Sequence, residues 1–193
     1  MLKLGLTGNI ASGKSQAEKI FKEFSIPVID ADEIVKKLYC DKSFVRKLRQ
    51  YFEKFDFIEK DVINKEKLLK ILFSDENFKN EFEKFVHPFV LREIEKFFEE
   101  NSLQRITVAS VPLLFEAGWE KHFDKILLIT ACDEIRLERL MKRNSISKEE
   151  AIVRINAQIP QARKIKKADF VIENNSDLEE LNKKIKDLFG SLK

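Results

Sequence analysis

The chain has 193 residues, a length that suits one compact domain with an insertion but not two independent enzymatic domains. Hydrophobic residues make up 44% of it and charged residues 36%, so the composition is that of a folded protein rather than a disordered one. The 36 basic and 33 acidic side chains leave a net charge of +3, which gives no reason to expect a nucleic-acid partner.

Two further features of the composition exclude other classes of protein. Cys40 and Cys132 form neither a C-x-x-C pair nor a cluster with histidine, so we expect neither a zinc site nor a disulfide framework. No stretch approaches 18 apolar residues and no leader segment is recognisable, so we expect no membrane partner. We therefore expect a cytoplasmic protein, and the oligomeric state stays open.

Five short runs of apolar and β-branched residues predict β-strands. They cover residues 2–7, 25–30, 106–111, 126–130 and 170–172. Helical periodicity fills intervals between and after them, at 14–24, 133–143 and 178–189. Strands that alternate with helices predict an α/β fold with a central, mostly parallel sheet.

Between the second and third strands the pattern changes to amphipathic helix. From residue 43 to residue 98 we find no convincing strand, and eleven of the seventeen phenylalanines lie there. Their three- and four-residue spacing predicts helices whose rings form the core of an insertion. His87-Pro88 interrupts this pattern, so we expect a broken or kinked helix there. His87 is then either a structural residue or one placed near a ligand.

Three of the five glycines lie in the first thirteen residues, and they lead into a phosphate loop. Residues 8–15 read Gly-Asn-Ile-Ala-Ser-Gly-Lys-Ser and match G-x-x-x-x-G-K-[ST] completely. The glycines allow N–H groups to point at phosphate oxygens, Lys14 reaches the β- and γ-phosphates, and Ser15 offers its hydroxyl to Mg²⁺. A strand precedes the motif and a helix follows it, so we predict binding of a nucleoside triphosphate.

Length and motifs narrow the class of enzyme to a small-molecule kinase. The segments that begin at Asn64 and Asn182 fail the guanine-reading Asn-Lys-x-Asp pattern, so a GTPase is disfavoured. A kinase needs a carboxylate that orients the acceptor hydroxyl, and Asp30 and Asp32 stand where the second strand ends. If Asp30-Ala31-Asp32 is extended, both carboxylates point the same way; alternatively, one of them caps the following helix.

Five of the nine arginines fall within 28 residues, at positions 136, 139, 143, 154 and 163. The first three share one face of a helix. Residues 147–150 (Ser-Lys-Glu-Glu) are a capping box that opens a second helix, on which Arg154 and Gln158 are neighbours and which Pro160 ends. We expect a helical lid that folds over phosphates, and the alternative is a solvent-exposed charged hairpin.

Taken in order, these motifs resemble the dephospho-CoA kinase family over nearly the whole chain. The matching segments are residues 5–8 and 12–15, 28–32 (Val-Ile-Asp-Ala-Asp), 87–88 (His-Pro), 111–116 (Val-Pro-Leu-Leu-Phe-Glu), 139–143, 154–158 and 168–174. The phosphate loop alone is shared by many activities, but this ordered combination is specific.

The resemblance implies a three-layer α/β/α P-loop kinase fold in which a five-stranded, mostly parallel sheet carries a helical insertion and a helical lid. The nucleotide-binding core is expected at 1–35 and 104–193, the acceptor-binding insertion at 36–103 and the lid at 136–165. The implied reaction uses ATP and Mg²⁺ to phosphorylate the ribose 3′-hydroxyl of dephospho-CoA, the final step of coenzyme A synthesis. The alternatives are a kinase of a nucleoside, nucleotide or other hydroxyl substrate, and a non-enzymatic ATP-binding regulator.

The resemblance also implies roles for individual residues. The implied catalytic residues are the base Asp32 together with Lys14, Arg139 and Arg143. The residues implied to bind dephospho-CoA are Asp32, His87, Glu116 and Lys65, and those implied to bind Mg²⁺ are Ser15 and Asp32. ATP is implied at Gly8, Asn9, Ala11, Ser12, Gly13, Lys14, Ser15 and Gln16.

The chain departs from the family pattern at several positions. Asn9 and Ala11 replace two glycines of the usual loop and Gln16 replaces the common threonine, but neither glycine belongs to the minimal motif, so nucleotide binding should survive. Lys65 stands where an arginine is common, which predicts a weakened bidentate contact. Ser110 stands where an acid is often found, so the metal is expected on other groups of the site.

Overall fold

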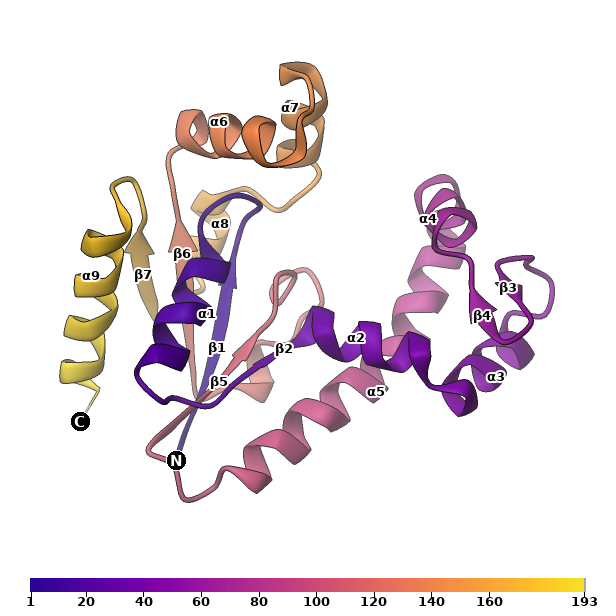
Figure 1. Cartoon of the computed structure of the whole chain (residues 1–193), viewed down its shortest axis with the longest axis horizontal. Helices are drawn as coiled ribbons and strands as arrows, with labels where there is room; N and C mark the ends of the chain where they lie inside the picture. The colour runs from indigo at the N-terminus through magenta and orange to yellow at the C-terminus, as the bar shows by residue number, and fades with distance from the viewer. Residues whose placement is uncertain (193) are drawn as a thin grey trace. The chain divides into compact units, whose positions relative to one another are not determined.

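The computed structural model describes residues 1–192 of the chain. They fold into two compact units, the first formed by Met1–Ile29 with the chain from Asn101 on, and the second by Asp30–Glu100. A five-stranded sheet in the order β2-β5-β1-β6-β7 lies in the first unit (Figure 1). Its strands are β1 (Leu2–Gly8), β2 (Val28–Asp30), β5 (Ile106–Ser110), β6 (Lys125–Thr130) and β7 (Phe170–Glu173).

The strand pairings of the central sheet are parallel. In β1, Leu2 lies opposite Ile106 of β5, and Leu4 lies opposite Lys125 of β6. The pairing of β6 with β7 is parallel as well. The five predicted strands and the α/β class are confirmed. Because the carboxyl ends of parallel strands meet at one edge, the segments that follow β1, β5 and β6 leave the sheet together, where ligands of such sheets bind.

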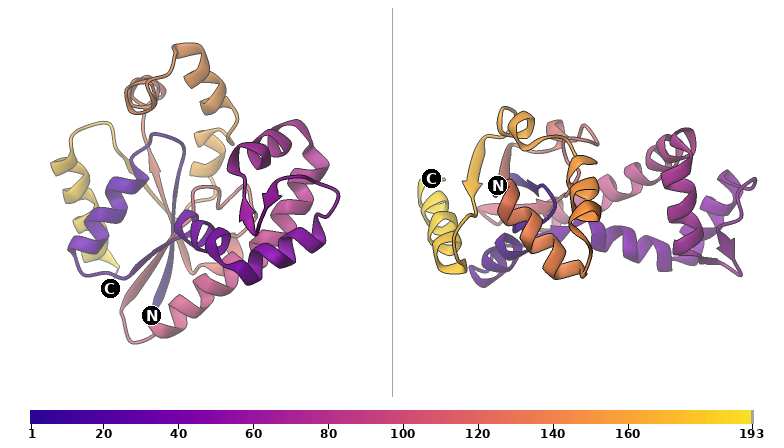
Figure 2. Two further views of the ribbon diagram at one scale, coloured as in Figure 1. Left: turned by 45° about the vertical axis from the view of Figure 1, so that its right-hand side comes forward. Right: turned by 90° about the horizontal axis from the view of Figure 1, so that it is seen from above.

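Helices α1 (Lys14–Glu23) and α9 (Leu178–Ser191) lie side by side on one face of the sheet (Figure 2). The core beneath them is formed by buried side chains of both helices and of the strands, among them Leu4, Leu6, Ile20, Phe21, Leu127 and Ile185. A fully buried side chain of this size contributes about 1.5–3 kcal/mol of transfer free energy. This apolar layer fixes the start of α1, and with it the loop that joins β1 to α1.

On the opposite face of the sheet, side chains pack so close to β1 that position 5 requires a glycine. A Cβ atom at Gly5 would lie 2.8 Å from Leu114 Cδ1 and 2.9 Å from Phe123 Cγ, so only glycine lets these side chains pack on β1. Helix α8 (Gln161–Ile165) joins this layer, because Lys164 forms an ion pair with Glu116. The expected three-layer organisation is therefore present in the first unit.

Four helices and a small hairpin form the second unit. The helices are α2 (Ala31–Cys40), α3 (Lys42–Tyr51), α4 (Lys65–Ser74) and α5 (Glu76–Glu100). Rings from α5 and from the segment between α3 and α4 make a cluster of edge and tilted contacts, here called the phenylalanine cluster: Phe52, Phe55, Phe57, Phe78, Phe82 and Phe85. The interpretation of these rings as the core of a helical insertion agrees with their contacts.

The expectation that residues 43–98 contain no strand is wrong. Two-residue strands β3 (Ile58–Glu59) and β4 (Val62–Ile63) pair antiparallel across a turn in which Lys60 and Asp61 have φ angles of 49° and 63°. Such left-handed pairs usually contain glycine or asparagine, so the sequence carries no turn signal. Ion pairs of Asp61 with Arg46 and Arg49 of α3 hold the turn in place.

Of the two outcomes expected at His87-Pro88, a broken or a kinked helix, the break is absent, because α5 runs through Pro88 as one 25-residue helix. Proline at this position removes one backbone hydrogen bond, but buried side chains on both sides, Phe82, Val86 and Val90, keep the helix packed. Pro88 itself is exposed, where water can satisfy the freed carbonyl. Among residues 1–192, no helix is long and apolar enough to cross a bilayer.

The arginine-rich segment forms two helices, α6 (Asp133–Asn144) and α7 (Lys148–Asn156). The predicted capping box is confirmed, with Ser147 and Glu150 bonded reciprocally at the start of α7. Two details differ from the prediction. Helix α7 ends at Asn156, so Gln158 lies beyond it, and Pro160 caps α8 instead of ending α7.

Candidate active site

The loop between β1 and α1 has the geometry of a phosphate cradle. Gly13 has a φ of +102° and begins α1 without a side-chain cap, and the first turn of α1 contains no acid. A Cβ at Gly13 would lie 1.9 Å from Asn174 Nδ2, and a Cβ at Gly8 would lie 2.7 Å from the Ile129 carbonyl oxygen. Both glycines are thus required, and the uncapped helix start presents its N–H groups and positive dipole end.

Polar side chains hold the loop from outside. Asn174, the residue that follows β7, donates from Nδ2 to the Ser12 carbonyl at 2.8 Å. Gln158 Oε1 accepts from the Ile10 N–H at 2.7 Å, and Asn9 Nδ2 donates to the Ile159 carbonyl at 2.9 Å. The loop is therefore in direct contact with the segment between α7 and α8.

Lys14 lies at the start of α1 and points toward the end of β5. Its ammonium group donates to Glu18 at 2.5 Å and to the Ser110 hydroxyl at 2.6 Å. The same hydroxyl donates to Glu18 at 2.5 Å. Sequence reasoning did not single out Glu18, whose only signal is its position one helical turn after Lys14.

Arginines of α6 contact the surroundings of the loop. Arg136 is 2% exposed and donates from Nε to the Ile10 carbonyl at 3.1 Å and from Nη1 to Asp133 at 2.8 Å. Burial lowers the pKa of the Arg136 guanidinium, and Asp133 opposes that shift. Arg139 donates to the carbonyls of Asn174 and Ser176, at 3.0 and 3.5 Å.

Several buried polar atoms near the loop have no hydrogen-bond partner among residues 1–192. They are Asn9 Oδ1, Ser12 Oγ and Arg136 Nη2. Buried polar atoms of this kind are rare, and each calls for a missing group. The guanidinium and the hydroxyl can both donate to phosphate oxygens, so the residues fit a phosphate ligand.

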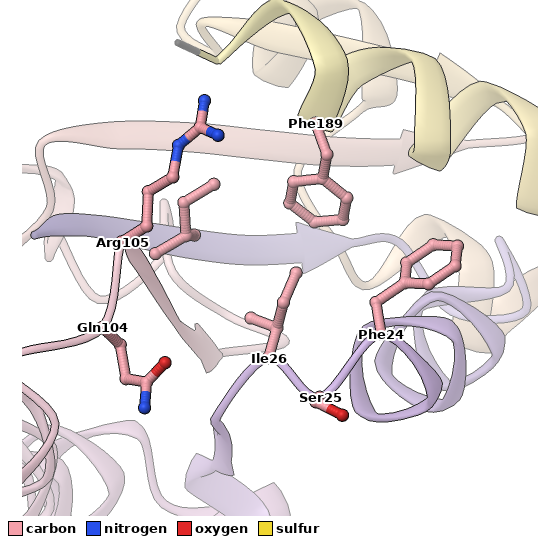
Figure 3. A pocket seen from close by; sticks show the side chains of 7 residues that line it. Phe24, Ser25, Ile26, Gln104, Arg105 and Phe189 are labelled. Atoms are coloured by element: carbon pink, nitrogen blue, oxygen red, sulfur yellow. The ribbon is translucent and has the colours of Figure 1, made fainter.

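One groove of the first unit lies away from this loop. It is lined by Phe24, Ser25, Ile26, Gln104, Arg105, Ile106 and Phe189 (Figure 3). Ile106 opens β5 and Ile26 precedes β2, so the groove lies at the amino ends of the strands. No predicted site residue lines it, and we assign the candidate active site to the carboxyl edge of the sheet.

Comparison with protein families decides which kinase this site belongs to. Residues 2–180 match the family described as dephospho-CoA kinase. The chain belongs to this family. Its enzymes phosphorylate dephospho-CoA with ATP in coenzyme A biosynthesis.

Individual relatives of the dephospho-CoA kinase family agree with this result. The dephospho-CoA kinase of Listeria innocua is 37% identical over 188 residues, which are 94% of this chain and 92% of the relative. A solved structure from Thermus thermophilus is 32% identical with a TM-score of 0.83, covering 100% of this chain and 98% of that one. A solved dephospho-CoA kinase from Campylobacter jejuni is 27% identical with a TM-score of 0.75, covering 98% and 96%.

The two acidic residues at the end of the second predicted strand, Asp30 and Asp32, differ in their contacts at the start of α2. Asp30 caps α2, accepting from the N–H groups of Asp32 at 2.7 Å and Glu33 at 3.4 Å. Asp32 lies in the first turn of α2 and is exposed. The extended Asp30-Ala31-Asp32 arrangement is therefore wrong, because the helix begins at Ala31. The capping alternative holds for Asp30, which leaves the Asp32 carboxylate exposed to solvent.

The other predicted acceptor residues of the dephospho-CoA kinase family lie in both units. His87 is half-buried in α5, where burial lowers its pKa and Glu83 opposes that shift. Lys65 is the first residue of α4 and is exposed. In the first unit, Glu116 pairs with the fully buried Lys164 at 2.7 Å and accepts from the Ile159 N–H at 3.3 Å.

Three further predicted site residues, Arg143, Ser15 and Gln16, lie at the surface. Arg143 is exposed and donates from Nε to Asn144 at 2.9 Å. Ser15 and Gln16 are exposed on the first turn of α1. Within residues 1–192, no group of three or more histidine, cysteine, aspartate or glutamate side chains is arranged to hold a metal ion. A hydroxyl such as that of Ser15 can still bind Mg²⁺ that a nucleotide brings with its phosphates.

Proposed function

We propose that the chain transfers the γ-phosphoryl group of ATP to the ribose 3′-hydroxyl of dephospho-CoA and releases coenzyme A and ADP. The observation that carries this proposal is the uncapped start of α1 behind Gly13, in a chain that belongs to the dephospho-CoA kinase family. Phosphoryl transfer needs little covalent chemistry from the protein, so catalysis depends on position and charge. The site supplies both.

The phosphate loop binds ATP through its backbone, at residues 8–16. The N–H groups at the start of α1 donate to phosphate oxygens, and the positive end of the helix stabilises their charge. Lys14 adds an ammonium group at the β- and γ-phosphates. Ser12 Oγ and Arg136 Nη2 contribute buried donors that have no partner in the described part of the chain.

The acceptor hydroxyl needs a base, and Asp32 is the residue that we assign to it. Its exposed carboxylate accepts the proton of the 3′-hydroxyl as the new P–O bond forms. Glu116, His87 and Lys65 are assigned to the binding of dephospho-CoA. Lys65 offers dephospho-CoA a single point charge, whereas the arginine that is common at this position would offer two parallel hydrogen bonds.

The lid is formed by residues 136–165, and its arginines act on the transferred group. Arg143 is exposed, so it can turn to the γ-phosphoryl group without leaving a buried partner. Arg139 exchanges its bonds to the Asn174 and Ser176 carbonyls for bonds to phosphate. Guanidinium groups suit this role because they bind phosphate oxygens in pairs.

Mg²⁺ is the cofactor that the proposed reaction needs, and Ser15 and Asp32 are the side chains that we assign to hold it. When bound, the ion neutralises charge on the phosphates. The fit rests on donor chemistry, since hydroxyl and carboxylate oxygens are the ligands that magnesium prefers. We expect the enzyme to work in the cytoplasm.

A coupled assay of ADP release tests the proposed function. The purified chain is given MgATP with dephospho-CoA, adenosine, AMP or shikimate, each in a separate reaction. We expect turnover with dephospho-CoA alone. Turnover with another of these acceptors but not with dephospho-CoA would identify a different kinase, and ATP binding without turnover on any acceptor would indicate a regulator.

A further inference from the structure

We propose that Glu18 is a positioning residue for phosphoryl transfer, whose carboxylate holds the Lys14 ammonium in its working orientation. The proposal rests on the proposed function of the phosphate loop. It adds a residue that does not belong to the phosphate-loop motif and that lies one helical turn inside α1.

Three side chains form a closed ring of hydrogen bonds. Lys14 Nζ lies 2.5 Å from Glu18 Oε1 and 2.6 Å from Ser110 Oγ, and Ser110 Oγ lies 2.5 Å from Glu18 Oε1. The Ser110 hydroxyl therefore accepts from the ammonium and donates to the carboxylate. One serine at the end of β5 joins both charged partners, which come from α1.

The ring is largely removed from water. The side chains of Lys14 and Glu18 are 13% and 11% exposed, and Ser110 is fully buried. At this exposure an ion pair is screened less than a surface pair, and its geometry is fixed by the helix and the strand that carry it. Two bonds fix the rotation of the ammonium, and so they set the direction in which the third N–H bond points.

Stability alone does not account for an acid at this position. Glu18 lies next to Ala17 and near Ile20 and Phe21, which are buried in the apolar core of the first unit. Replacing a buried ion pair by apolar side chains is often neutral or stabilising, because desolvation offsets the attraction. The two partners of Glu18 both lie at the phosphate site, so the acid serves that site.

The isosteric variant Glu18→Gln removes the charge and keeps the shape. The variant loses a charge-assisted hydrogen bond to Lys14, so we expect kcat with dephospho-CoA to fall at least about tenfold. The KM for MgATP should change less than about threefold, because the loop backbone still binds the phosphates. Glu23→Gln, at the exposed end of the same helix, is the matched control and should keep the wild-type kcat.

A rescue experiment separates charge from structure. Glu18→Ala should lose activity, and Glu18→Ala/Ser110→Asp should restore kcat to within about threefold of the wild type, since residue 110 already lies in contact with Lys14. Melting temperatures are measured for every variant. An unchanged kcat in Glu18→Gln, or a double variant no faster than Glu18→Ala, would overturn the proposal.

The activity of the wild-type chain distinguishes failure of the proposed function from failure of the proposed role of Glu18. If the wild-type chain does not phosphorylate dephospho-CoA, the proposed function fails whatever Glu18 does. The same variants are then compared on the acceptor that the chain does use. An unchanged kcat in Glu18→Gln on that acceptor also overturns the role of Glu18.

Discussion

Gly13 of the phosphate loop and Phe57 of the phenylalanine cluster are both fixed by their surroundings, but for different reasons. A Cβ at Gly13 would lie 1.9 Å from Asn174 Nδ2, so the backbone itself is the functional group there. Phe57 is completely buried among Phe52, Phe78 and Phe82, so its side chain carries the fold of the second unit. In the proposed function the phosphate loop binds phosphate through its N–H groups, whereas the phenylalanine cluster provides a scaffold for exposed polar residues.

This difference predicts that the largest loss of stability comes from the second region. Phe57→Ala should lower the free energy of unfolding by about 3–5 kcal/mol, because it leaves a cavity among rings that cannot fully collapse. Urea unfolding measures the change. Phe73→Ala is the matched control, since Phe73 is 88% exposed, and it should cost less than about 0.5 kcal/mol. Equal losses in the two variants would contradict a packed phenylalanine cluster.

We expect exposed residues of the second unit to contribute to catalysis but little to the stability of the fold. Asp32→Asn should lower kcat at least about a hundredfold and leave ATP affinity nearly intact, as expected for the loss of an acid–base group. Steady-state kinetics and calorimetric titration with ATP measure the two quantities. Glu33→Gln, the next and equally exposed residue, is the control. A wild-type rate in Asp32→Asn would remove this residue from catalysis.

We propose that the lid, residues 136–165, takes part in catalysis, and Arg143 tests this. Arg143→Ala should lower kcat about tenfold with little change in melting temperature, because the exposed guanidinium stabilises only the transferred group. Lys142→Ala, its exposed neighbour, is the matched control. A loss of stability as large as the loss of activity would favour the charged hairpin over a lid.

The smallest effect concerns strain in the phosphate loop. Ala11 has a φ of 62°, a left-handed conformation that costs a non-glycine residue about 1–2 kcal/mol. Glycine removes this strain but makes the unfolded chain more flexible, so Ala11→Gly should stabilise the protein by no more than about 1 kcal/mol. Thermal unfolding checks it, and a destabilised variant would show that the methyl group packs favourably.

The two regions also differ in how far the sequence predicts them. The phosphate loop is fixed by glycines and a lysine at set spacing, so its residues could be assigned before the structure. In the second unit the hairpin turn at Lys60 and Asp61 lacks glycine, and buried side chains keep α5 intact through Pro88. Local sequence patterns therefore do not predict the backbone conformation where tertiary packing determines it.

Within the candidate site, Asn174 and Glu18 are not predicted as site residues, and each also contacts a residue that is distant in the sequence. Asn174 reaches the Ser12 carbonyl across 162 positions, and Ser110 meets Glu18 across 92. The sequence shows that Ser110 replaces an acid, but it does not show that Glu18 faces it. The sequence of the acidic pair allows either capping of α2 by Asp30 or an extended segment, and only the backbone geometry separates the two interpretations.

The identity of the product tests the proposed function most directly. The wild-type chain is incubated with MgATP and dephospho-CoA, and the product is examined by ³¹P NMR and mass spectrometry. We predict one added phosphoryl group on the ribose 3′-oxygen, giving coenzyme A, with one ADP released for each. A phosphoryl group at another position, or ADP release without phosphorylated dephospho-CoA, would contradict the assignment.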